Sequence, residues 1–204
     1  MLKVNIKINR LFLPILLGIT SAVITMICDV ALSENSPIIS IKHNDYMIQG
    51  STAAQLRQQM NKLGPVDKIS GKHFDAYTGW NVRTNYRYKP VGNQCKIYTV
   101  TVKIDVTFTM PKWNIPVNSS SDLKIRWNRY MNDLQTHEDG HKDNGIGAGT
   151  EVFKMLNAVV APSCDQINNI ANERTKAIIK KYNQKDIDYD HRTQHGRTQG
   201  AFFP

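Results

Sequence analysis

The segment Lys96–Met110, KIYTVTVKIDVTFTM, carries the clearest β-strand pattern in the chain. Its side chains alternate with a period of two, which places successive residues on opposite faces of a sheet. The more apolar face consists of Tyr98, Val100, Val102, Ile104, Val106 and Phe108. Threonine and charged residues fill much of the other face. The pattern therefore predicts a half-buried strand, and Pro111 and Pro116 follow where the pattern stops.

A helix is predicted after this strand, because apolar residues then recur at intervals of three and four. The stripe consists of Leu123, Trp127, Tyr130, Met131 and Leu134. Candidate N-caps precede it in the run Ser119–Asp122. Continued at the same spacing, the stripe reaches His137, Glu138 and His141. These polar side chains are therefore expected to face the interior rather than solvent.

The stretch Gln135–His141, QTHEDGH, has the spacing of a zinc site. Residues four apart project from one face of a helix, so His137 and His141 can bind one ion at about 2.0–2.1 Å. Glu138 is angled away from His137 and can instead take a proton from a water on the metal. The alternative, a solvated polar helix face, is disfavoured by the apolar stripe upstream. Gly140 costs a helix about 1 kcal/mol relative to alanine, unless another group approaches that turn closely.

A zinc site of this kind needs a third protein ligand from elsewhere in the chain. The longer pattern HExxHxxGxxH is absent, because position 147 is glycine rather than histidine. The remaining candidates are downstream acids and histidines, namely Glu151, Glu173, Asp190, His191 and His195. A histidine in the polar tail stands out more than a glutamate on a lysine-rich helix.

The regions before the central strand predict a strand over residues 38–49 and a helix over residues 52–63, ended by Gly64-Pro65. An aromatic-rich stretch after Gly71 is also close to a period of two. With the central strand and the motif helix, these elements predict one α+β domain over residues 34–204.

The region after the motif is less regular. Glycines at positions 145, 147 and 149 are expected to weaken the motif helix. A last helix is predicted from about Asp165 to Tyr182, started by a capping box at Ser163–Gln166, and the polar tail from Lys185 is predicted to be non-helical. We expect an antiparallel sheet packed beside the HExxH helix and this C-terminal helix.

Residues 1–33 have the composition of a secretory signal peptide. Three basic residues precede an uncharged apolar run from Leu11 to Ile27, and Ala31-Leu32-Ser33 offers small residues before a cleavage point. An uncleaved membrane anchor is the alternative, because the run is at the short limit for a membrane-spanning helix. We therefore expect a secreted or periplasmic protein.

Cleavage would remove Cys28 and leave Cys95 and Cys164. Two cysteines in an oxidising compartment most simply form a disulfide, and neither has the CxxC partner typical of a zinc site. The 204 residues carry a net charge of +9, which favours anionic surfaces. There is no clustered basic stripe or nucleic-acid-binding motif, so nucleic acid is not an expected partner. Membrane contact is expected only through an uncleaved N-terminus, and no particular oligomeric state is predicted.

Short motifs spread over Tyr46–Pro204 occur together in one bacterial family. They are Tyr46-Met-Ile-Gln-Gly50, Gly64-Pro65, Thr78-Gly-Trp80, Cys95, Cys164, His137-Glu138-Asp139-Gly140-His141, Tyr189-Asp190, Thr193-Gln-His195-Gly196, Gln199-Gly200 and Phe203-Pro204. On these motifs the chain resembles the domain of unknown function 922 family, whose members are predicted secreted zinc-dependent proteases. The resemblance implies a zincin-like fold, Zn²⁺ as cofactor and metallopeptidase activity without an established substrate.

Carried over by position, the resemblance implies three zinc ligands, His137, His141 and His195. It implies that Glu138 is the general base and that Asp190 is a carboxylate that orients His195. Tyr189 is expected to donate a hydrogen bond to the oxyanion, or alternatively to anchor the tail by packing. Thr78 and Trp80 are expected to be structural.

We therefore predict an exported zinc metallopeptidase that hydrolyses peptide bonds in envelope proteins or peptidoglycan peptides, with a zinc-bound water activated by Glu138. The first alternative is a zinc-binding but non-catalytic cell-envelope module. The second is a zinc-free interaction protein whose histidines are structural.

Overall fold

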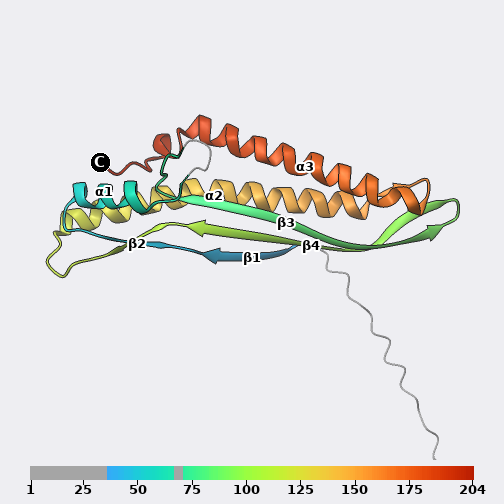
Figure 1. The fold of residues 1–204 in the computed structure, drawn as a ribbon, viewed down its shortest axis with the longest axis horizontal. Helices are drawn as coiled ribbons and strands as arrows, with labels where there is room; N and C mark the ends of the chain where they lie inside the picture. The colour runs from blue at the N-terminus through green and yellow to red at the C-terminus, as the bar shows by residue number, and fades with distance from the viewer. Residues whose placement is uncertain (1–35, 67–70) are drawn as a thin grey trace, which may run out of the picture. The chain divides into compact units, whose positions relative to one another are not determined.

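A long β-hairpin forms the centre of the fold in the computed structural model, which describes residues 36–66 and 71–204 (Figure 1). Its strands, β3 (Tyr77–Val91) and β4 (Gln94–Thr109), pair antiparallel along their whole length. Gly92, with a φ of 60°, takes the left-handed conformation that suits the tight turn between them. The strand predicted at residues 96–110 is confirmed as most of β4.

The buried face of β4 is the predicted one from Val100 onward, but not at Tyr98. The register between β3 and β4 shifts at Arg87 and Tyr88, so that Tyr98 is the extra residue of a bulge. The bulge reverses the alternation, which buries Ile97 and leaves Tyr98 51% exposed.

The sheet is mixed, in the order β1-β4-β3, with β6 also paired to β4. β1 (Ile38–His43) runs parallel to β4, whereas β6 (Val160–Ala161) runs antiparallel to it. The predicted antiparallel sheet is therefore correct for the β3–β4 hairpin and wrong for β1. The chain between β1 and β4 is long enough to make the crossover that a parallel pair requires.

The strand predicted over residues 38–49 is interrupted, and its second half is β2 (Tyr46–Gln49). β2 pairs in parallel with β5 (Pro111–Asn114) in a separate two-stranded sheet. The backbone bridges the interruption, because the Asn44 N–H donates to the Phe108 carbonyl at 2.8 Å and the Tyr46 N–H to the Met110 carbonyl at 3.0 Å. The β2–β5 pair thus continues from the end of the β1–β4 pair.

The described residues form three α-helices, α1 (Ala53–Leu63), α2 (Ser121–Asn157) and α3 (Cys164–Thr193). α2 lies along the hairpin, and α3 runs back beside α2 in the opposite direction (Figure 1). Ser120 caps α2 by accepting a hydrogen bond from the Leu123 N–H at 3.2 Å, and Thr52 caps α1 in the same way. The helices predicted at residues 52–63 and after Ser119–Asp122 are confirmed.

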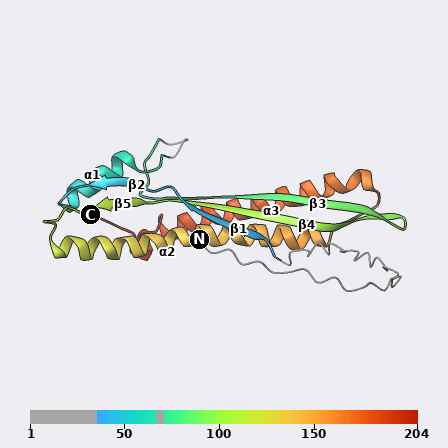
Figure 2. The same ribbon diagram turned by 90° about the horizontal axis from the view of Figure 1, so that it is seen from below.

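The last residues of the chain lie beside α1 and the start of α2 (Figure 2). Phe203 is buried, and its ring centroid lies 5.4 Å from that of Trp127 and 5.1 Å from that of Tyr130. This contact anchors the tail that follows α3 to the apolar stripe of α2.

α2 continues without a break through the three glycines that were expected to weaken it. Each glycine lies where a neighbour approaches the helix backbone: Gly145 faces the Trp80 ring, Gly149 faces Ile104 on β4, and Gly147 faces Tyr182 on α3. A side chain at any of these positions would overlap its neighbour. The glycines therefore cost helix propensity but allow close packing against the sheet and against α3.

α3 is longer than predicted and includes residues 185–193 of the tail predicted to be non-helical. Side chains of this extension, from Asp186 to Asp190, bond to α2 and β3, and these contacts outweigh a weak intrinsic preference for helix. At its other end, Ser163 is the N-cap residue but makes no side-chain cap bond, so the predicted capping box does not form.

A disulfide joins Cys95 at the start of β4 to Cys164 at the start of α3, as predicted. It closes a loop with a sequence separation of 69 residues. In the chain-entropy account, such a loop stabilises the fold by about 4 kcal/mol. A disulfide of this kind is characteristic of proteins in oxidising compartments.

The predicted signal segment, residues 1–33, lies outside the described residues. Within residues 36–66 and 71–204, none of the helices combines the length and apolar character needed to cross a bilayer.

Candidate metal centre

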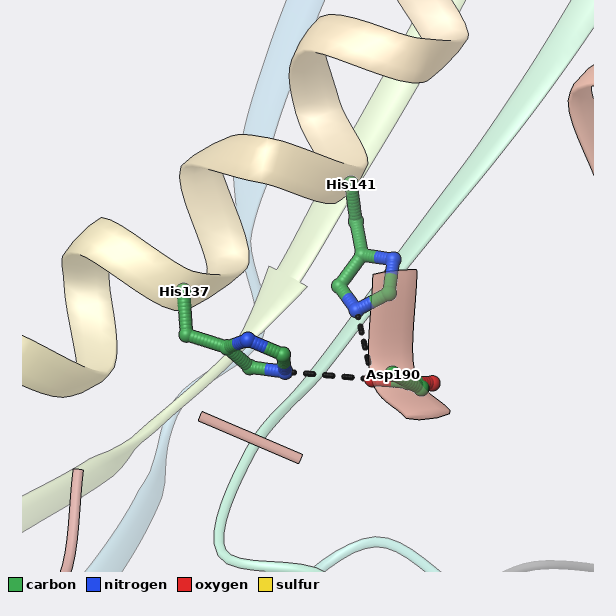
Figure 3. Close-up of side chains that lie close together, drawn as sticks. All are labelled: His137, His141 and Asp190. Carbon is green, nitrogen blue, oxygen red and sulfur yellow. Dashed lines mark hydrogen bonds and ion pairs between the residues drawn. The ribbon is translucent and has the colours of Figure 1, made fainter. Parts of the chain in front are cut away.

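The motif on α2 faces the interior, as its spacing predicts. His137, Glu138 and His141 are only 4%, 3% and 8% exposed, and they continue the buried stripe that includes Trp127 and Leu134. Both histidines point away from α2 toward Asp190 on α3 (Figure 3). The two helices therefore meet at these side chains.

One carboxylate oxygen lies close to both imidazole rings. Asp190 Oδ1 lies 3.2 Å from His137 Nε2 and 3.1 Å from His141 Nε2. The three possible donor atoms all lie within 4.8 Å of one another. Donors at such separations can surround one ion that sits about 2.0–2.2 Å from each. The group His137, His141 and Asp190 can thus bind a metal ion.

The far nitrogen of each ring is held by a different partner. His137 Nδ1 lies 3.0 Å from Gln199 Oε1, and His141 Nδ1 lies 3.0 Å from Asp186 Oδ1. An Nδ1–H that donates to its oxygen acceptor leaves Nε2, once it has lost its proton, as the atom that can bind a metal ion. The rings are thereby oriented for metal binding.

Asp186 is itself fixed by two further donors. The Trp80 Nε1–H donates to Asp186 Oδ2 at 2.6 Å, and the Asn144 side-chain amide donates to Oδ1 at 2.7 Å. A bonded carboxylate on His141 increases the basicity and fixes the orientation of the ring. Trp80, expected only to be structural, therefore also connects β3 to the candidate metal centre through Asp186.

The electrostatics of the three donors reflect this proximity. Burial opposes protonation of His141, but hydrogen bonds to Asp186 and Asp190 outweigh burial and raise its pKa to about 10. Burial likewise opposes ionisation of Asp190, yet hydrogen bonds from His137 and His141 hold its pKa below the usual range. In the absence of a metal ion, positive charge on His141 thus balances the Asp190 carboxylate.

Glu138 lies beside the donors without joining them. The Thr78 hydroxyl donates to Glu138 Oε2 at 2.6 Å. Burial raises the pKa of Glu138 above that of an ordinary glutamate, more than the Thr78 bond and the nearby histidines lower it. A raised pKa makes this carboxylate a stronger base than that of an exposed glutamate.

The metal donors and Glu138 line one cleft with a volume of ≈ 570 Å³. Its walls come from the segment before and at the start of β3, from α2, from the end of α3 and from the tail. The donors are consequently buried against α2 and α3 on one side and accessible from the cleft on the other.

Tyr189 packs between the two helices. Its ring is stacked on His137 with centroids 5.1 Å apart, and its hydroxyl donates to the His137 carbonyl at 3.2 Å. Gly140 lies directly over this ring, where any side chain would overlap it. Close approach of Tyr189 thus accounts for the glycine within the motif. These contacts correspond to the packing alternative for Tyr189, and its role as an oxyanion donor stays a prediction.

The resemblance implies His195 as the third metal ligand, and this role stays a prediction, whereas the donor group in the structure consists of Asp190 and the two histidines. His195 Nδ1 lies 3.4 Å from Asp190 Oδ1, but the side chain is 59% exposed and outside the donor group. The reason is the extension of α3, which places Asp190 on the inner face of the helix, whereas His195 follows after the helix has ended.

The other candidate ligands lie away from the donor group. Glu151 forms an exposed ion pair with Lys181 at 2.8 Å, and Glu173 and His191 are exposed on α3. None of the three lines the cleft.

Three contributors to the centre are not identified from the sequence. Asp186 precedes Asp190 by four residues, a helical spacing that would have indicated a shared face had the tail been predicted as helix. Thr78 is predicted only as structural, and Gln199 belongs to a motif of the resemblance, Gln199-Gly200, which implies no role for it.

Comparisons with known proteins identify the family of the chain. No curated protein and no solved structure matches it. A family model described as bacterial protein of unknown function (DUF922) matches residues 43–196, which include the motif, Asp186, Asp190 and His195. The chain therefore belongs to the DUF922 family of bacterial proteins.

Proposed function

We propose that this protein is an exported zinc-dependent metallopeptidase. The observation that carries the proposal is the arrangement around the cleft, in which two histidines and an aspartate converge beside a buried glutamate that is not one of the donors. A structural zinc site is usually closed by four protein ligands, whereas a catalytic site has three and an open position. Three donors at an accessible cleft fit the second type.

The donor set fits zinc. Two imidazoles and one carboxylate are common zinc ligands, and both rings have the bonded Nδ1–H that such ligands usually have. The same donor types also bind iron(II) and other divalent ions. The neighbouring Glu138, one residue after the first histidine, favours zinc and hydrolysis over redox chemistry.

Each side chain then has a defined task. His137, His141 and Asp190 would hold the ion, and Asp186 and Gln199 keep the two rings in place. Zinc in this position would polarise the peptide carbonyl and increase the acidity of a water molecule. Glu138 accepts the proton of the attacking water, and Thr78 holds the carboxylate in place for that transfer. Glu138 can then deliver the proton to the leaving amine.

The substrates in this proposal are peptide bonds in envelope proteins or peptidoglycan peptides outside the cytoplasm. The Cys95–Cys164 disulfide supports this location, because such bonds persist in oxidising compartments.

The substitution Glu138→Gln tests the proposal. Glutamine keeps the size of the side chain and can still accept the Thr78 hydrogen bond, but it cannot take a proton. We expect hydrolysis of a broad peptide mixture, followed by mass spectrometry, to fall by about 10²- to 10⁴-fold, the usual contribution of a general base. Zinc content, measured by elemental analysis, should stay near one ion per chain.

The matched control is Glu173→Gln, which changes an exposed glutamate of α3 away from the cleft. Its activity and zinc content should equal those of the wild type. Zinc binding without any hydrolysis by the wild type would favour a non-catalytic module. Absence of zinc from a chain purified without chelators and offered the ion would end the metallopeptidase proposal.

A further inference from the structure

The chain leaves α3 through a turn with an uncommon backbone conformation. Gln194 and His195 are both left-handed, with φ of 52° and 53°, and Gly196 follows at 82°. One left-handed residue is a common helix ending, but two consecutive non-glycine residues in this region are sterically disfavoured. Such backbone persists only where surrounding contacts hold it, and it clusters at functional sites. The turn brings His195 and Arg197 to the wall of the cleft.

The side chains of this turn rest on aromatic rings of the same cleft. The His195 ring centroid lies 5.2 Å from that of Phe74, and the Arg197 guanidinium carbon lies 4.5 Å from the centroid of Phe202. His195 and Phe202 are both more than half exposed, so the group lies at the mouth of the cleft. We refer to Phe74, His195, Arg197 and Phe202 as the rim cluster.

The acidic side chains of the cleft are engaged by other protein groups. Asp75 accepts both terminal guanidinium nitrogens of Arg57 at 2.7 Å and the Tyr130 hydroxyl at 2.7 Å. Asp186 and Asp190 bond to the metal-centre histidines. The positive charge of Arg57 is therefore balanced within the fold.

Arg197 has no such balance. Among the described residues its guanidinium contacts the Phe202 ring but forms no ion pair with a carboxylate. The rim cluster thus presents an unneutralised positive charge and hydrogen-bond donors to whatever enters the cleft. A ring beneath the guanidinium restricts its movement and leaves its N–H edge available.

We propose that the rim cluster binds a carboxylate of the substrate, with Arg197 as the charged contact and His195 as a hydrogen-bonding neighbour. The proposal rests on the proposed peptidase function and defines its substrate class, namely peptides with a carboxylate close to the bond that is cleaved. A guanidinium matches a carboxylate through two parallel N–H···O bonds. In a peptide this group comes either from an acidic side chain or from the free C-terminus.

Binding of four matched pools of random octapeptides separates these two sources. One central position is fixed as glutamate or glutamine, and the C-terminus is either a free acid or an amide. The full-length Glu138→Gln chain, loaded with zinc and immobilised, retains peptides without cleaving them, and mass spectrometry counts those retained. We expect a carboxylate pool to exceed its neutral counterpart by about tenfold, the size of one charge-assisted contact.

If more peptides are retained from the glutamate pools than from the glutamine pools, the bound carboxylate is a side chain. If more are retained from the free-acid pools than from the amide pools, it is the C-terminus. Adding Arg197→Gln should abolish the preference, whereas Arg197→Lys should keep part of it. The control is Arg174→Gln, which removes an exposed guanidinium of α3 that does not line the cleft. Zinc content of each variant verifies that the metal centre is intact.

Equal retention of all four pools, retention of none, or a preference that survives Arg197→Gln would overturn the carboxylate site. The peptidase proposal fails separately. A wild-type chain that hydrolyses none of the pools, while the preference for carboxylates is intact, would overturn the peptidase function and leave the rim cluster as a binding site.

Discussion

The two helices of the metal centre contribute to it in different ways. On α2, the histidines and Glu138 continue the apolar stripe that packs the helix into the core, so one periodicity determines both packing and ligand placement. On α3, Asp186 and Asp190 belong to a polar stretch with few buried side chains, which is helical through its contacts with α2 and β3. The possible metal donors on α2 are thus specified locally, and those on α3 only by the neighbouring elements.

Removal of the α3 donor is the strongest test of this comparison. We expect Asp190→Ala to lower zinc affinity by more than about a hundredfold, since structural zinc sites gain roughly 3 kcal/mol per ligand. His195→Ala should leave the affinity unchanged. Competition with a chromophoric chelator measures both. The opposite order would return His195 to the role predicted from the sequence and would mean that the end of α3 rearranges when zinc binds.

The residues that hold the two rings provide the next test. Asp186→Ala and Gln199→Ala should each lower zinc affinity by about 10- to 100-fold, the usual effect of removing the partner of a metal-bound histidine. Asp188→Ala is the matched control, because among the described residues the side chain of that exposed aspartate on α3 bonds only to Gln184. Unchanged affinity in both variants would show that α2 alone orients the rings.

Contact between the helices can be tested through Gly140. Alanine at this position overlaps the Tyr189 ring. We expect Gly140→Ala to lower the free energy of unfolding by about 1–3 kcal/mol in urea titrations, despite the better helix propensity of alanine. In a chain that already carries Tyr189→Ala, adding Gly140→Ala should lower the free energy of unfolding by less than it does in the wild type. A Gly140→Ala chain more stable than wild type would mean that the two helices are not closely packed there.

The pH dependence of zinc binding reports on the same pairing with a smaller effect. Hydrogen bonds to Asp186 and Asp190 raise the pKa of His141 to about 10, so below that pH a proton must leave before Nε2 can bind the ion. Affinity should therefore rise with pH, by about tenfold per unit for one displaced proton, and level off above pH 10. Asp186→Ala removes a cause of the high pKa and should move the plateau to lower pH. An affinity that is flat between pH 6 and 9 would contradict the protonated state.

The sequence predicts what depends on local spacing and misses what depends on contacts between distant segments. The alternation of residues 96–110 and the stripe from Leu123 to His141 predict β4 and α2, because in each case one face is buried along the whole element. The disulfide is also predictable, since only two cysteines lie in the domain.

The features that sequence reasoning missed share a physical cause. The glycines of α2 and the polar end of α3 have poor helix propensity, and both are helical because side chains of another element pack or bond there. Parallel pairing of β1, the bulge at Tyr98 and the approach of Asp190 to the two histidines likewise follow from tertiary arrangement. No single segment carries the information that determines them.

The glycines of α2 have a mechanical consequence. Gly140 and Gly147 let α3 residues touch the helix backbone, and Gly145 and Gly149 let β3 and β4 residues do the same from the sheet side. Backbone atoms, unlike side chains, have no rotamers through which a gap could be refilled at another width. The spacing between the imidazole pair and the facing carboxylate therefore depends on how closely the two helices pack at these glycines.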